Sequence, residues 1–122
     1  MIDLNDLKEV NDTYGHDYGN IYLQNISNVI CNTFIHSPVF RIGGDEFAVV
    51  LKNNDYDKIE TLVEEFNRTL SECTNLDNQW EQLSAAIGYA LYDPQKDSCA
   101  DDVFQRADKN MYQNKKTMKK GR

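Results

Sequence analysis

The chain has 122 residues, of which 40% are hydrophobic and 11% aromatic, and its formal net charge at pH 7 is −7. This length suits one domain with a single two-layer core, and the composition is that of a folded globule rather than a disordered segment. The acidic balance argues against general binding to nucleic acid or anionic membranes, because no basic surplus displaces counterions from phosphates. No apolar run reaches the length of a membrane span or signal peptide.

The three cysteines, Cys31, Cys73 and Cys99, are widely spaced and odd in number. They show neither the CxxC spacing of a metal site nor the pattern of a disulfide framework. We therefore expect incidental thiols in a reducing compartment.

The beginning of the chain, residues 1–4, is predicted to be the end of a strand. It starts abruptly with apolar residues and no turn or cap precedes them, so we expect a domain truncated at its N-terminus. Asp6 is predicted to N-cap a short helix over residues 7–10. Turn-forming residues at 11–16 are expected to end that helix.

A longer helix is predicted from residue 19 to residue 34, because apolar side chains recur there near the 3.6-residue period. The proline after Ser37 ends it, since proline disfavours helix in the residue before it. The apolar positions are Ile21, Leu23, Ile26, Val29, Ile30 and Phe34.

The stretch from Val39 to Leu51 reads as a β-hairpin in which Gly43 and Gly44 supply the positive φ of a primed two-residue turn. Asp45 and Glu46 follow directly. Glycine lets the backbone approach a bulky anion, while adjacent acids repel each other unless a cation neutralises them. The turn therefore indicates a phosphate ester bound through a metal. For this motif alone, a solvated acidic turn is the alternative.

The rest of the chain predicts one amphipathic helix over residues 59–70, a polar loop or edge strand over 74–82, and a buried strand over 83–91. A final helix carries Val103, Ala107 and Met111 and ends in a basic cluster. This order of elements predicts an α+β fold with helices packed on a mainly antiparallel sheet.

Five motifs, spread in order over nearly the whole chain, together resemble the GGDEF family of diguanylate cyclases. The family's N-terminal helix and most of its first strand are missing. The resemblance implies a single GGDEF domain over residues 1–122, with a ferredoxin-like fold similar to the palm of nucleotide cyclases and polymerases. The motifs are Asp3–Asp12, Gly15–Asn20, Gly43–Phe47, Ala86–Ala90 and Ala107–Lys115.

The activity that the resemblance implies is the condensation of two GTP into cyclic di-GMP, with release of pyrophosphate. It implies a homodimer in which each subunit presents one GTP, with Mg²⁺ or Mn²⁺ as the cofactor. A divalent ion suits this reaction because it lowers the pKa of a 3′-hydroxyl and neutralises charge at the α-phosphate. The resemblance also implies a sensory domain upstream and a cytoplasmic location, alone or as part of a membrane-attached protein.

By position in the motifs, Asp3 and Asp45 resemble the metal carboxylates of the family, with the Leu4 carbonyl as a further ligand. Glu46 is implied to support metal binding, and Asp45 to help activate the hydroxyl. Asp3, Asp45 and Glu46 are thus the expected catalytic residues. For Asp3 alone, a strand-end acid facing water is the alternative.

The nucleotide is expected to meet other residues. Lys8 and Lys115 resemble the family's phosphate-contacting lysines, and Asn11 matches the residue that hydrogen-bonds the guanine edge. Gly43 and Gly44 would let the turn lie against the triphosphate. The alternatives are a helix-end asparagine for Asn11 and a solvated cation complementing the helix dipole for Lys115.

The sequence departs from the family pattern in three places. Asn20 stands where the family usually has an aspartate that accepts two guanine N–H groups, so guanine selectivity should weaken. Phe34 and Ser37 replace the RxxD of the inhibitory product site, so that site should be absent. Lys119 holds the place of a phosphate-binding arginine, without its bidentate fork, unless Arg122 reaches in from a longer loop.

Two further functions therefore compete with the cyclase. One is a non-catalytic GGDEF module that senses a nucleotide, and the other is a cyclase with relaxed purine choice because of Asn20.

Overall fold

The computed structural model describes residues 1–120, with side chains to residue 118. Its strands form one antiparallel sheet in the order β2-β3-β1-β4, which agrees with the predicted α+β class. Strand β1 lies inside the sheet and pairs with both β3 and β4. The strands are β1 (Ile2–Leu4), β2 (Val39–Arg41), β3 (Glu46–Val49) and β4 (Ala85–Ile87).

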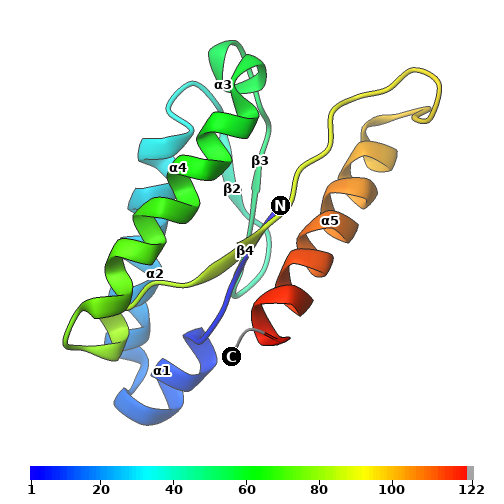
Figure 1. The fold of residues 1–122 in the computed structure, drawn as a ribbon. Helices are drawn as coiled ribbons and strands as arrows, with labels where there is room; N and C mark the ends of the chain where they lie inside the picture. The colour runs from blue at the N-terminus through cyan, green and yellow to red at the C-terminus, as the bar shows by residue number, and fades with distance from the viewer. Residues whose placement is uncertain (121–122) are drawn as a thin grey trace.

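Two long helices, α2 and α4, cover one face of the sheet and α5 covers the other (Figure 1). Within the described residues, no helix is long and apolar enough to cross a membrane. The helices are α1 (Leu7–Tyr14), α2 (His16–Thr33), α3 (Asn54–Asp57), α4 (Ile59–Glu72) and α5 (Ala100–Lys120), with 3-10 turns η1 (Cys73–Asn75) and η2 (Gln79–Glu81).

The alternation of side chains along β1 decides what each face of the sheet receives. Ile2 and Leu4 are almost fully buried in the main core, which lies under α2 and α4. Because successive side chains of a strand point to opposite faces, Asp3 projects toward α5. A smaller apolar cluster, including Ala86 and Met111, holds α5 against that second face.

Helices α1 and α2 are joined by one residue, Gly15, whose φ of 96° lies in the left-handed region. The prediction of a turn over residues 11–16 was wrong, because this glycine alone reverses the chain. Helix α1 therefore continues to Tyr14, and α2 begins at His16, three residues before the predicted start. Asp6 precedes α1, but its side chain makes no capping hydrogen bond.

The hairpin of β2 and β3 is present, but its turn differs from the prediction. Four residues, 42–45, separate the strands, and Gly15 is the one glycine with positive φ among the described residues. The amides of Ile42 and Gly43 both donate to the carbonyl oxygen of Glu46, at 3.0 and 3.4 Å. The longer loop spreads the reversal over more residues, so the glycines need no left-handed conformation.

Strand β4 is shorter than the predicted strand over residues 83–91, because its partner β1 has only three residues. The predicted polar segment over 74–82 is a loop with 3-10 turns, not an edge strand. All three cysteines are free.

An aromatic cluster closes the end of the molecule where α1 meets α2. The ring of Trp80 lies 5.0 Å from Tyr14 and 4.4 Å from Tyr18, centroid to centroid. Trp80 belongs to η2, so the cluster ties that loop to the joint between α1 and α2.

Asp55 connects α3 to the segment that leads into β2. Its side chain is 3% exposed, and Oδ2 accepts hydrogen bonds from the His36 amide at 2.8 Å and the Ser37 hydroxyl at 2.7 Å. Hydrogen bonds to a buried carboxylate stabilise more than neutral ones, and removing the acceptor leaves buried donors unpaired.

We expect Asp55→Ala to lower the free energy of unfolding by about 3 kcal/mol, because two charge-assisted hydrogen bonds are lost. Urea unfolding followed by circular dichroism measures this. The exposed Asp57 on the same short helix is the matched control, and Asp57→Ala should change stability by less than about 0.5 kcal/mol. Equal effects of the two substitutions would contradict the assignment of Asp55 as a structural link.

Candidate functional site

A cleft of about 450 Å³ opens between the joint of α1 with α2 and the turn of the hairpin. Five of the residues predicted from the sequence line it. Its remaining lining includes Gly19 and Arg41, which were not predicted as site residues from the sequence. The five predicted residues are Lys8, Asn11, Asn20, Gly44 and Asp45.

The helical end of the cleft carries the two asparagines. Asn11 lies on α1 and Asn20 on α2, and the reversal at Gly15 brings these helices side by side. Asn11 is half-buried, whereas Asn20 is exposed. Amide groups that both donate and accept hydrogen bonds suit the edge of a purine base.

Gly19 on α2 packs against the side chain of Asn11 on α1. Glycine inside a helix costs about 1 kcal/mol relative to alanine, so its presence in α2 calls for a local reason. An unfavourable glycine inside a predicted helix is therefore the feature of the sequence that could have identified Gly19 as a site residue.

The other end of the cleft is the hairpin turn. The guanidinium of Arg41 donates to the carbonyl oxygens of Gly43 at 3.2 Å and Gly44 at 2.8 Å. A Cβ added at Gly44 would meet no atom within 4 Å, so the protein itself does not require glycine there. Open space beside a glycine backbone suits the close approach of a ligand.

A second group of predicted residues lies beside the cleft, on the face of the sheet toward α5. Asp3 stands opposite Glu46 in the register of β1 and β3. The Lys115 ammonium lies 2.8 Å from Asp3 Oδ2. The amide of Leu4 donates to the Asp45 carbonyl at 2.8 Å, so this bond joins the second group to the cleft.

The electrostatics of this group are those of crowded acids. Burial raises the pKa of Glu46 above its usual value, and the neighbouring carboxylates of Asp3 and Asp45 raise it further, against the opposing effect of Lys115. Asp3 Oδ1 is buried without a hydrogen-bond partner among the described residues. Both features fit a site that accepts a hard cation.

The side chains alone do not form a complete metal cage. In the part of the chain that the structure describes, no three His, Cys, Asp or Glu side chains converge as ligands. Magnesium sites often use one or two carboxylates and complete the shell with substrate phosphates and water. The residues therefore fit an ion that arrives with a nucleotide, and do not fit a resident, all-protein site.

The remaining predicted positions lie apart from the cleft. Phe34 is 2% exposed in the core, and Ser37 bonds to Asp55, so both replacements of the RxxD pattern have structural contacts. The side chain of Lys119 and the whole of Arg122 lie outside the described residues.

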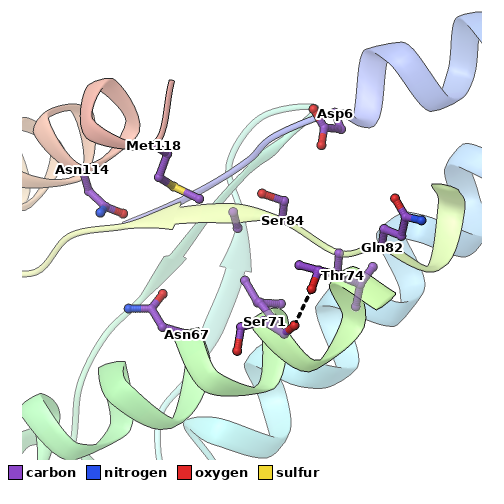
Figure 2. A pocket seen from close by; sticks show the side chains of 11 residues that line it. Asp6, Asn67, Ser71, Thr74, Gln82, Ser84, Asn114 and Met118 are labelled. Atoms are coloured by element: carbon purple, nitrogen blue, oxygen red, sulfur yellow. Dashed lines mark hydrogen bonds between the residues drawn. The ribbon is translucent and has the colours of Figure 1, made fainter. Parts of the chain in front are cut away.

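A further cleft of about 450 Å³ lies between α4, β4 and α5 (Figure 2). Most of its polar side chains are neutral, such as Asn67, Ser71 and Asn114, and none of the predicted site residues lines it. The chemistry that the sequence predicts is therefore confined to the cleft beside the hairpin and the acids next to it.

Comparison with known proteins identifies related chains. The chain is 32% identical over 117 residues to "Diguanylate cyclase A" of Treponema denticola, covering 94% of this chain and 31% of that protein. It is 33% identical over 122 residues to "Diguanylate cyclase DgcP" of Escherichia coli, covering 98% of this chain and 36% of that protein. The chain thus spans about a third of the length of these relatives.

Among solved structures, the active GGEEF domain of a diguanylate cyclase from Vibrio cholerae matches with a TM-score of 0.79 and 27% identity. The match covers 95% of this chain and 74% of that one. The family profile described as "Diguanylate cyclase, GGDEF domain" matches residues 1–121. The resemblance drawn from the five motifs is confirmed, and the chain belongs to the GGDEF-domain family.

Proposed function

We propose that this chain is the catalytic domain of a diguanylate cyclase, which condenses two GTP into cyclic di-GMP and releases two pyrophosphates. The observation that carries the proposal is the cleft that joins Asn11 and Asn20 at one end to Gly44 and Asp45 at the other. Such a cleft has the polarity that a purine nucleotide needs, with amides for the base and a glycine turn for the phosphates.

In this proposal Asn11 and Asn20 bind the guanine edge, and Lys8 contacts the phosphates from α1. Lys115 approaches from α5, where it already neutralises Asp3 at 2.8 Å. Gly43 and Gly44 let the hairpin backbone lie against the triphosphate. Lysine serves as a point charge for phosphate, so neither contact requires the planar geometry of arginine.

The acids next to the cleft have the catalytic role in this proposal. Asp3, Asp45 and the Leu4 carbonyl would hold Mg²⁺ or Mn²⁺, with Glu46 in support. When bound, such an ion lowers the pKa of the attacking 3′-hydroxyl and neutralises charge at the α-phosphate. Asp45, which lines the cleft, would accept the hydroxyl proton. The hydroxyl oxygen then bonds to the α-phosphorus as pyrophosphate leaves.

The size of the site supports a homodimer in this proposal. A cleft of about 450 Å³ suits one nucleotide, while each new phosphodiester needs the 3′-hydroxyl of another. We infer that two copies face each other, each with one GTP. By analogy with relatives about three times its length, we further propose an upstream regulatory domain that controls this pairing, and a cytoplasmic location.

The first test is turnover. Purified protein with GTP and Mg²⁺ or Mn²⁺ should form cyclic di-GMP at a rate that rises more steeply than linearly with protein concentration. Asp45→Asn should lower the rate by at least about 100-fold, because a carboxylate acting on the transition state is lost. Asp57→Ala, far from the cleft, is the control and should keep the rate. Liquid chromatography with mass spectrometry measures the product.

Calorimetric titration with GTP distinguishes the cyclase from the competing function, a nucleotide-sensing module. GTP binding with no product at any protein concentration would favour the module over the cyclase. Absence of both binding and product would exclude both functions.

A cyclase with relaxed purine choice is favoured by one observation, the amide of Asn20 in the cleft. An amide accepts one hydrogen bond but must also donate, so it cannot accept both N1–H and N2–H of guanine. Unlike an aspartate, it therefore gives little advantage to guanine over adenine.

We expect Asn20→Asp to raise the preference for GTP over ATP by about tenfold, the effect of one restored hydrogen bond to a charged group. Product identity from GTP alone, ATP alone and an equal mixture measures this preference. Asn28→Asp makes the same change at an exposed position of α2 and should leave the products unchanged. An unchanged product mixture in Asn20→Asp would remove the asparagine from base selection.

A further inference from the structure

The contact between Gly19 and Asn11 carries an inference about base recognition. Gly19 is the fourth residue of α2, is buried, and has no left-handed backbone that would demand glycine. Alanine is the better helix former at such a position. Space for a neighbouring group is then the remaining reason for glycine.

That neighbour is the Asn11 side chain. A Cβ built on Gly19 would lie 1.6 Å from Asn11 Oδ1, 2.7 Å from Cγ and 3.4 Å from Nδ2. Apart from the neighbouring residues and backbone of α2 itself, these are the three heavy atoms nearest to that Cβ, so the amide of Asn11 packs against the backbone of Gly19. Figure 1 shows α1 next to the beginning of α2.

The backbone of Asn11 has little freedom to move away from Gly19. Val10, the preceding residue, is fully buried in the core. The Asn11 carbonyl accepts a hydrogen bond of 2.9 Å from the amide of Gly15, at the reversal between the helices. A side chain at position 19 would therefore be accommodated by rotation of the Asn11 amide rather than by movement of α1.

We propose that Gly19 is a positioning residue that fixes the Asn11 amide in the orientation that reads the guanine edge. This inference rests on the proposed binding of a guanine nucleotide in the cleft, which both residues line. In this proposal Gly19 acts through Asn11 and not through a contact of its own with the base. Its contribution is the absence of a Cβ, which allows the amide to settle against the helix and face the cleft.

The test is a double-mutant cycle of Gly19→Ala and Asn11→Ala. Binding of the α,β-methylene analogue of GTP, which cannot release pyrophosphate, is measured by calorimetry with Mg²⁺, and thermal unfolding is measured without nucleotide. Gly19→Ala should weaken binding about tenfold while the melting temperature stays equal or rises. In the Asn11→Ala background, Gly19→Ala should not weaken binding further, and should raise the melting temperature.

Asn28→Ala is the matched control, since it changes an exposed residue of the same helix to alanine and should leave binding unchanged. Wild-type affinity in Gly19→Ala, or a double variant that binds more weakly than Asn11→Ala, would overturn the inference. If Gly19→Ala alone fails to fold, the double variant decides the question. A double variant that folds and binds with the affinity of Asn11→Ala supports the inference. A double variant that does not fold overturns it. Wild-type protein that binds no analogue contradicts the proposed function instead.

Discussion

The main-chain pairing of β1 with β3 and β4 supports both layers of the molecule at once. Ile2 and Leu4 turn into the core under α2 and α4, so the residue between them must project from the opposite face. A shift of one residue in this register would bury Asp3 and expose its apolar neighbours. The position of the acidic group therefore follows from the hydrophobic core, which selects the register.

The negative charge on the face of the sheet toward α5 is partly neutralised by a lysine of α5, which is distant in the sequence. Asp3 and Glu46 stand opposite each other on paired strands, and like charges in that arrangement repel. Lys115 on α5 supplies one positive charge to Asp3 and opposes the rise in the pKa of Glu46. Helix α5 is thus held by apolar packing along its length and by an ion pair near its end.

The family and the α+β class could be predicted because motifs and periodicity are local properties of the sequence. The pairing of Asp3 with Lys115 could not, since nothing in their spacing brings residues so far apart together. The turn at Gly43 was predicted wrongly because a glycine pair indicates positive φ only for two-residue loops. The contact of Gly19 with Asn11 depends on the single dihedral reversal at Gly15, which propensities do not specify. The roles assigned to the site residues stay predictions.

The aromatic cluster at the joint of α1 and α2 has a practical consequence. The chain has one tryptophan, and its indole packs against Tyr14 and Tyr18 at the end of the molecule that carries the asparagines of the cleft. All tryptophan emission therefore comes from a single place, with two phenol rings close enough to transfer excitation to it. Trp80 is therefore an intrinsic fluorophore at the joint between α1 and α2. Opening or closing of this joint can be followed in solution by tryptophan fluorescence, without attaching a dye.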